Sequence, residues 1–231
     1  MTAVHDIQEL ATIPLLEGLS EEHLKEMSQL LHQRKFPAGR NIMTVDQPGE
    51  TVYVLLKGSV KIYVDQVDGS EVILAFLGPG DTFGELSLVD SAGRSASVVA
   101  LEECSCLAMD RSSFHRSLKT ISELSYNLVR LLSRRLRPAN EQIQALSTLD
   151  VRGRVARQLL AFAQQYGVTG AEQGIRIPLR LTQTDVAALV GASRERVNQV
   201  IVDFKGDGFI TVDPSHYFTV LDQDALIARC Q

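Results

Sequence analysis

The sequence lacks features that mark secreted and membrane proteins. Only three of its 231 residues are cysteines, and this small, odd number argues against a disulfide framework and fits a reducing cytoplasm. No run of about 18 apolar residues occurs, so no membrane-spanning helix is predicted. The first six residues carry neither a basic start nor an apolar block, and no secretory signal peptide is therefore expected.

Residues typical of metal sites and catalytic centres are also scarce. Cys104 and Cys106 alternate on a predicted strand and are expected to point together into the core. No paired catalytic carboxylates and no nucleophile with a nearby base stand out, so neither an enzyme nor a metal cofactor is expected. The histidines lack the spacing of metal ligands; they are His5, His23, His32, His115 and His216.

The net charge of −5 is unevenly distributed along the chain. Residues 1–150 contain 14 lysines and arginines against 20 acidic residues, whereas residues 151–231 contain 9 against 8. A nucleic-acid-binding surface in the second part would therefore depend on a local cluster of basic side chains, and the acidic first part would weaken non-specific binding to DNA. The length is sufficient for two domains with separate cores.

Short β-rich segments separated by glycines occupy residues 34–109. Many short strands with regular turns are typical of a small barrel or sandwich. The predicted strands are 52–56, 59–64, 71–77, 96–100 and 104–109. Before them, residues 12–31 carry apolar side chains at helical spacing, with Ser20 as the N-cap of the second half.

A long helical pattern follows the strands and extends over residues 110–149. Its leucines and isoleucine recur every three or four residues, which is typical of an apolar stripe. Such a stripe can pack on the helix's own domain or on a second copy of the chain. We expect the first part to cover the barrel and the remainder to form a dimer. The stripe comprises Leu124, Leu128, Leu131, Leu132, Leu136, Ile143 and Leu146.

Two motifs between the predicted strands suggest a binding site for a cyclic nucleotide. Gly84-Glu85 supplies a glycine turn and a carboxylate, which can accept a hydrogen bond from a ribose 2′-hydroxyl. Arg94-Ser95 supplies a guanidinium that can hold a phosphodiester through two parallel N–H bonds. Alone, each motif is common in surface turns. Their combination predicts a buried guanidinium–carboxylate pair, Glu85 and Arg94, that traps a small cyclic anion.

A further motif, at residues 182–201, predicts a helix-turn-helix. Thr182 and Asp185 form a capping box, Gly191 breaks the first helix, and Ser193 caps the second. A helical hairpin without a nucleic-acid role has the same pattern. The buried positions holding the pair together are expected to be Ala187, Val190, Val197 and Val200, and a β-hairpin wing is predicted at residues 209–220.

The side chains at the start of the second helix favour DNA binding over the plain hairpin. Arginine can pair with guanine, glutamate can accept from cytosine, and asparagine or glutamine can pair with adenine. The predicted base-reading residues are Arg194, Glu195, Asn198 and Gln199. The predicted phosphate contacts, which set the register of the protein on DNA, are Thr182, Gln183, Ser193 and Lys205.

Together these motifs resemble the cyclic-AMP receptor protein/FNR (CRP/FNR) family of bacterial transcription regulators, and most closely its cyclic-AMP-binding class. The resemblance implies an α+β protein with an N-terminal β jelly-roll, a long dimerisation helix and a C-terminal winged helix-turn-helix. The implied boundaries are residues 12–118 for the cyclic-nucleotide-binding domain, 119–149 for the long helix and 151–224 for the DNA-binding domain, with the helix-turn-helix at about 182–202.

The resemblance also implies partners and a ligand site. A regulator of this class is a cytoplasmic homodimer that binds cyclic AMP as its effector and reads a palindromic TGTGA-like site in double-stranded DNA. RNA polymerase is the further expected partner, through the loop at residues 166–173. The residues implied to bind the nucleotide are Leu74, Phe83, Gly84, Glu85, Leu86, Ser87, Arg94, Ser95, Ala96, Arg135, Ala139 and Asn140.

Four positions depart from the cyclic-AMP receptor pattern or complicate it. The long helix carries Ala139 and Asn140 where that class has two hydroxyl residues facing the base, and Gln199 replaces a second arginine. Pro138 lacks an amide donor and is expected to loosen the helix, either as a tolerated kink or as part of a switch. Two alternatives stay open: a regulator triggered in another way or without ligand, and a nucleotide-processing enzyme.

Overall fold

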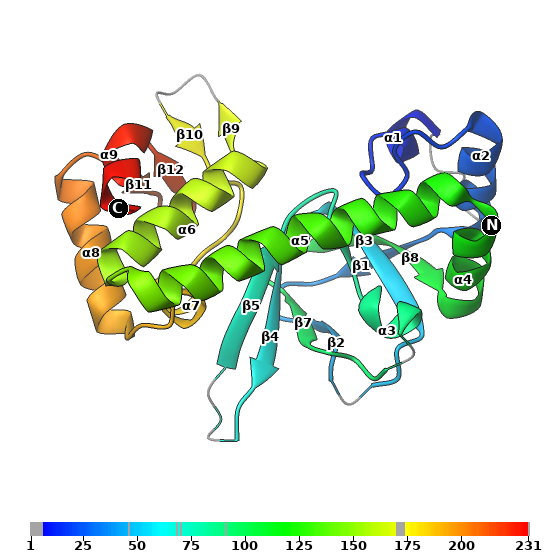
Figure 1. Ribbon diagram of the computed structural model, residues 1–231, viewed down its shortest axis with the longest axis horizontal. Helices are drawn as coiled ribbons and strands as arrows, with labels where there is room; N and C mark the ends of the chain where they lie inside the picture. Colours follow the sequence, from blue (N-terminus) through cyan, green and yellow to red (C-terminus); the bar gives the residue numbers. More distant parts are fainter. Residues whose placement is uncertain are drawn as a thin grey trace. The chain divides into compact units, whose positions relative to one another are not determined.

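The computed structural model describes residues 7–45, 47–67, 69, 71–90, 92–169 and 174–230. The chain divides into two compact units (Figure 1). The first comprises Met1–Ile62 and Phe76–Pro138, and the second comprises Tyr63–Ala75 and Ala139–Gln231. No helix in the described ranges is both long enough and apolar enough to cross a membrane.

The first unit begins with two short helices, α1 (Ile7–Ala11) and α2 (Glu21–Leu30). Ser20 caps α2 by accepting a hydrogen bond from the amide of His23, as predicted. The predicted helical pattern from residue 12 is wrong for its first half, because residues 12–18 form turns. Pro14 disfavours a helix interior, and Gly18 has a φ of +76° that helical backbone does not adopt.

Two antiparallel sheets form the β-roll, and this confirms the predicted jelly-roll fold class. Their strand orders are β1-β8-β3-β6 and β2-β7-β4-β5. In chain order the strands are β1 (His32–Phe36), β2 (Asn41–Met43), β3 (Thr51–Lys57), β4 (Val60–Asp65), β5 (Glu71–Leu77), β6 (Thr82–Phe83), β7 (Ser97–Ala100) and β8 (Cys104–Asp110). The sequence pattern did not indicate β1, β2 or β6. Cys104 and Cys106 are both buried in β8, as predicted.

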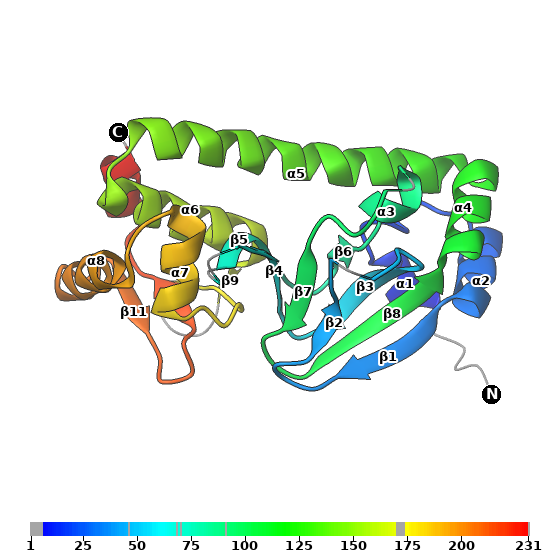
Figure 2. The same ribbon diagram turned by 90° about the horizontal axis from the view of Figure 1, so that it is seen from below.

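Three helices follow or interrupt the strands: α3 (Leu86–Val89), α4 (Arg111–Thr120) and α5 (Ser122–Thr148). The predicted continuous helix from residue 110 is therefore two helices, separated by the buried, extended Ile121. α5 continues through Pro138 without interruption. Figure 2 shows α2 and α4 beside the same end of strands β1 and β8.

The first part of α5 packs on its own unit, as predicted. Leu124 and Leu128 are buried in one apolar cluster with side chains of α2, β3 and β8. The buried side chain of Asn127 donates to the carbonyls of Leu15 and Glu17, which attaches α5 to the N-terminal segment. Further along α5, Leu136, Ile143 and Leu146 are exposed.

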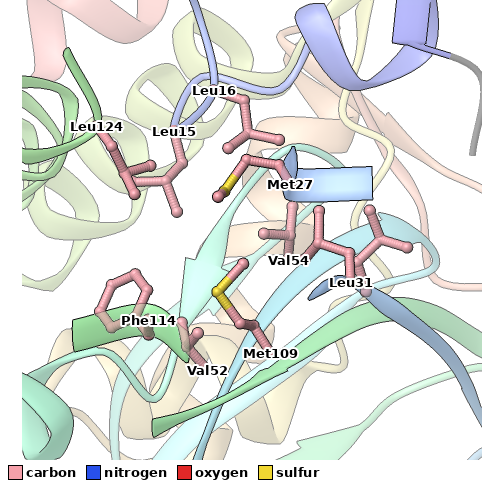
Figure 3. Close-up of a pocket in the computed structure, with 10 residues that line it drawn as sticks. Leu15, Leu16, Met27, Leu31, Val52, Val54, Met109, Phe114 and Leu124 are labelled. Carbon is pink, nitrogen blue, oxygen red and sulfur yellow. The ribbon is translucent and has the colours of Figure 1, made fainter. Parts of the chain in front are cut away.

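The core of this unit contains a small cavity, shown in Figure 3. Its volume is about 10 Å³, and its lining is entirely apolar, with Met27, Val54, Phe114 and Leu124 among the side chains. A cavity of this size has room for at most one water molecule, and its lining offers a water no side-chain hydrogen-bond partner. The cavity is a packing defect and no ligand site.

The second unit carries the winged helix-turn-helix. Its small sheet has the strand order β11-β12-β10-β9. In chain order its elements after α5 are α6 (Val151–Tyr166), β9 (Val168–Thr169), β10 (Ile175–Arg176), α7 (Gln183–Val190), α8 (Arg194–Gly206), β11 (Ile210–Val212), β12 (Phe218–Val220), α9 (Gln223–Ile227) and a 3-10 turn at Ala228–Cys230. The predicted wing is confirmed as the β11–β12 hairpin. α8 is longer than the predicted helix, which ended at residue 201.

Candidate functional sites

A tight turn between β6 and α3 brings the main chain close to Arg94. Gly84 has a φ of +82°, which favours glycine. A Cβ at this position would lie 2.7 Å from Arg94 Nη1 and 3.0 Å from the carbonyl oxygen of Thr51. Glycine is therefore required at residue 84 for two independent reasons, its backbone conformation and the lack of space.

The guanidinium of Arg94 is buried, with 7% of the residue exposed. Nη1 donates to the carbonyl oxygen of Gly84 at 2.8 Å and to Ser87 Oγ at 3.0 Å. Nη2 donates to the carbonyl oxygen of Thr51 at 2.8 Å. Burial lowers the pKa of Arg94 from its ordinary value, and the fields of Tyr53 and Glu85 oppose this shift. Arginine nevertheless remains charged, so the turn contains a fixed positive charge.

Glu85 is almost completely buried, with 1% of the residue exposed, and its partner is not Arg94. Glu85 Oε1 accepts from Arg135 Nη1 of α5 at 2.7 Å. Arg135 also donates to the carbonyl oxygen of Thr82. Glu85 and Arg94 are therefore both buried, as predicted, but they are not bonded to each other. Each is buried, but the carboxylate pairs with the long helix, and the guanidinium binds main-chain carbonyls.

Three buried polar atoms around this turn have no hydrogen-bond partner among the described residues: Glu85 Oε2, Arg94 Nε and Thr82 Oγ1. Leaving such an atom unpaired costs about 1–3 kcal/mol. The three atoms offer an acceptor, a cationic donor and a hydroxyl. This is the set that a ligand with both hydroxyl groups and a negative charge would satisfy.

The other predicted nucleotide-binding residues differ in burial. In the first unit, Phe83 is buried and stacked on Tyr53 at 5.3 Å between ring centroids, and Ser87 and Ala96 are buried too. Leu86 and Ser95 are exposed. The remaining three predicted residues belong to the second unit and are exposed there: Leu74 on β5, and Ala139 and Asn140 on α5.

The helix-turn-helix of the second unit forms as predicted. Thr182 Oγ1 accepts from the amide of Asp185, and Asp185 Oδ2 accepts from the amide of Thr182, which completes the capping box. Gly191 ends α7 in the left-handed conformation, with a φ of +61°. Ser193 Oγ caps α8 by accepting from the amide of Arg196. The four apolar residues predicted to hold the helices together are all buried: Ala187, Val190, Val197 and Val200.

The start of α8 presents polar side chains to solvent. The predicted base readers Arg194, Glu195, Asn198 and Gln199 are all exposed. Of the predicted phosphate contacts, Lys205 and Ser193 are exposed and Thr182 and Gln183 are half-buried.

The sequence analysis missed Arg152 and Asp203, which join α6 to α8. Arg152 Nη1 of α6 donates to Asp203 Oδ2 of α8 at 2.6 Å, and its guanidinium lies 5.4 Å from the ring centroid of Phe204. Asp203 Oδ1 also accepts from Gln199 Nε2 at 2.9 Å. The i, i+4 spacing of Gln199 and Asp203 could have indicated their contact. The partner on α6 lies 51 residues away and leaves no local signal.

Comparisons with known proteins identify the family of the chain. The family model of the cyclic nucleotide-binding domain matches residues 33–120, and that of the Crp-like helix-turn-helix domain matches residues 153–229. A CRP-like cAMP-activated global transcriptional regulator of Mycobacterium tuberculosis is 37% identical over 222 residues, covering 96% of this chain and 98% of its own length. The chain belongs to the CRP/FNR family. It is a DNA-binding transcription regulator with a cyclic-nucleotide-binding domain, and not an enzyme.

Other relatives extend this result. The cyclic AMP receptor protein of Thermus thermophilus is 33% identical over 201 residues, covering 87% of this chain and 89% of its own. Among solved structures, the Thermus thermophilus catabolite activator protein is 31% identical with a TM-score of 0.52, covering 94% of this chain and 98% of its own. FixK2 from Bradyrhizobium japonicum has a TM-score of 0.77 at 22% identity, and the match covers 87% of this chain and 98% of FixK2. This likeness shows the fold alone.

Proposed function

We propose that the chain is a homodimeric regulator whose binding to a palindromic, TGTGA-like DNA site is controlled by cyclic AMP. The observation that carries the proposal is the set of unpaired buried atoms around the Gly84 turn. Glu85 Oε2 is suited to accept the ribose 2′-hydroxyl. Arg94 Nε, with Ser95 beside it, is suited to the cyclic phosphate, because a guanidinium forms strong, charge-assisted bonds with phosphate oxygens.

The remaining nucleotide contacts are assigned from the resemblance to the cyclic-AMP-binding class. Phe83, Gly84, Leu86, Ser87 and Ala96 would shape the turn around the sugar and phosphate. Arg135 would connect the ligand to α5, because it already binds the carboxylate proposed to hold the ribose. We assign the base to Leu74, Ala139 and Asn140, where the Asn140 amide can meet the adenine edge. The names of cAMP-activated relatives support cyclic AMP as the effector.

The DNA contacts are assigned to the exposed start of α8. Arg194 would pair with guanine O6 and N7, Glu195 would accept from cytosine N4, and Asn198 and Gln199 would meet adenine. Phosphate contacts are assigned to Thr182, Gln183, Ser193 and Lys205, near the helix N-termini and at the end of α8, where N–H groups and positive charge attract phosphate.

The dimer is assigned to the outer face of α5. Tyr126, Val129, Leu136 and Ile143 are exposed large apolar side chains at spacings of three and seven residues, which is the pattern of a two-helix seam. Asn140 falls on the same seam, four residues after Leu136. A dimer would present two recognition helices about 34–36 Å apart, one turn of DNA. Sedimentation of the wild type and of Ile143→Asp tests this assignment, with a dimer expected only for the wild type.

Control by the nucleotide requires that it bind the DNA-competent state more tightly than the other state, because only differential affinity shifts such an equilibrium. Arg135 is the residue placed to carry this difference, since it joins the carboxylate of the turn to the long helix. We expect RNA polymerase as a further partner, through the loop at residues 166–173. Residues 170–173 of that loop lie outside the described residues.

A second candidate is a regulator that acts without a cyclic nucleotide. It is favoured by one observation: the Nη1 and Nη2 atoms of Arg94 already donate to Gly84, Ser87 and Thr51 of the chain itself. In that case the turn would serve as packing.

Calorimetric titration of the purified chain distinguishes the two candidates. We expect saturable binding of cyclic AMP. We expect much weaker binding of 5′-AMP, which has the same base and ribose but an open phosphate with a second charge. Cyclic GMP tests the assignment of the base. The absence of binding by all three ligands would favour the second candidate.

A further inference from the structure

Asp203 lies on the recognition helix α8 and holds two donors at once. Its Oδ1 accepts from Gln199 Nε2 at 2.9 Å, and its Oδ2 accepts from Arg152 Nη1 at 2.6 Å. Arg152 Nη2 also lies 3.7 Å from Asp207 Oδ2, and the guanidinium packs over the ring of Phe204. Gln199, a predicted base reader, is thereby attached through Asp203 to the body of the second unit.

The charge on Asp203 decides which end of the Gln199 amide faces it. An ionised carboxylate only accepts hydrogen bonds, so the amide nitrogen must face the carboxylate and the carbonyl oxygen Oε1 must face away. A carboxylate close to DNA would also repel phosphates. The guanidinium of Arg152 offsets this charge, which allows an acidic residue to occupy the recognition helix.

We propose that Asp203 is a positioning residue for DNA specificity, which fixes Gln199 with Oε1 outward so that it selects a base carrying an exocyclic amine. Adenine N6 and cytosine N4 present such a donor in the major groove, whereas guanine O6 and thymine O4 are acceptors. The second N–H of Gln199 remains available for adenine N7, so adenine is the preferred base. This inference rests on the proposed role of Gln199 as a base reader.

The test measures base preference rather than affinity alone. The full chain, saturated with cyclic AMP, is first used to select a site from random DNA, and its affinity is then measured for every single base-pair substitution of that site. Gln199→Ala identifies the base pair that Gln199 reads. At that pair we expect the wild type to prefer adenine over guanine by at least about fivefold, the lower end expected for a specific base contact.

Asp203→Ala is expected to reduce this preference to less than about twofold while the preferences at all other base pairs persist. Arg152→Met is the matched variant. It removes the bond between α6 and α8 but keeps the Gln199–Asp203 contact, so it should lower affinity for all sites equally and preserve the preference. Asp224→Ala, at an exposed acid of α9, controls for the loss of one negative charge.

Three outcomes overturn the inference. Asp203→Ala could keep the full preference, or Arg152→Met could lose it to the same extent, which would reduce Asp203 to a structural link between helices. If Gln199→Ala changed no base pair, the proposed role of Gln199 would be wrong, and the inference would fail with it. A change with Gln199→Ala but none with Asp203→Ala overturns only the present inference.

Discussion

The turn around Gly84 and the exposed start of α8 place their polar side chains in opposite environments. In the turn, Glu85 and Arg94 are buried and bonded to the protein, and a few polar atoms among them lack a partner. On α8, Arg194, Glu195 and Asn198 are exposed to solvent. A buried polar group contributes to the stability of the fold as well as to binding, whereas an exposed polar group contributes little to stability.

This difference leads to a rule for the two sites. Substitutions in the turn should change ligand affinity and stability together, because the same hydrogen bonds serve both. Substitutions on the exposed face of α8 should change DNA affinity alone. The following predictions test this rule, starting with the largest expected effect.

Arg94→Gln should abolish most of the affinity for cyclic AMP. The lost charge-assisted hydrogen bond from Nε to the phosphate, at about 1.5–3 kcal/mol, corresponds to a loss of at least about 10-fold. The melting temperature should fall as well, because the bonds to Gly84 and Thr51 are lost. Calorimetry and thermal unfolding measure both effects. Arg34→Gln, at an exposed arginine of β1, is the control and should change neither. Unchanged cyclic-AMP binding by Arg94→Gln would contradict the assigned site.

Gly84→Ala should destabilise the first unit more than Gly39→Ala does. Both glycines have a positive φ, +82° and +77°, so both substitutions incur a backbone penalty of about 1–2 kcal/mol. Only at Gly84 would the new Cβ also collide with Arg94 and Thr51, since nothing lies within 4 Å at Gly39. Overpacking adds about 1–3 kcal/mol. Urea unfolding measures the two free energies, and equal losses would show that the close approach at Gly84 has no energetic consequence.

Arg194→Ala should reduce DNA affinity by about 1–3 kcal/mol and relax the preference at one base pair. Its side chain is exposed, so the free energy of unfolding should stay within about 0.5 kcal/mol of the wild type. Cyclic-AMP affinity should not change. Fluorescence anisotropy with labelled DNA and a urea titration provide the two measurements. A large loss of stability in Arg194→Ala would contradict the rule that exposed residues of α8 change DNA affinity alone.

Asp110→Ala has the smallest expected effect and touches neither site. Asp110 caps α4 by accepting from the amide of Ser113. Hydrogen bonds from Ser112 and Ser113 hold the pKa of Asp110 below its ordinary value. A lowered folded-state pKa gives stability that is present above the unfolded pKa of about 3.9 and is lost as the pH falls through the folded pKa.

The free energy of unfolding of Asp110→Ala should therefore be about 1 kcal/mol lower than that of the wild type at pH 7. The difference should shrink as the pH falls below about 4, where the carboxyl begins to take up its proton in the unfolded chain. Urea unfolding over this pH range measures it. A difference that did not depend on pH would exclude the charged cap as its cause.

The features that the sequence predicted are local ones. The caps of α7 and α8 depend on residues three positions apart, and Thr182, Asp185 and Ser193 could be identified from spacing alone. The break after α4 was missed, because Ile121 matches the apolar spacing of the helical pattern and is neither glycine nor proline, so it carries no local signal for a break. Strand β1 was missed because its residues are mostly polar and exposed, and it is held by pairing with β8.

The partners within the sites could not be predicted for the same reason. The sequence indicated that Glu85 and Arg94 belong to one site, but the arginine that binds Glu85 lies 50 residues further along, on α5. That helix contains several arginines, and any of them could form an ion pair with a buried carboxylate as far as the sequence shows. Only the fold selects Arg135, just as it selects Arg152 for Asp203.

The most direct test of the account is the affinity of the full chain for its selected DNA site, measured with and without cyclic AMP for the wild type and for Arg135→Ala. We predict that cyclic AMP tightens DNA binding by the wild type and that Arg135→Ala, which disconnects the carboxylate from the long helix, still binds cyclic AMP but loses most of this tightening. Equal DNA affinity with and without cyclic AMP in the wild type would contradict the account.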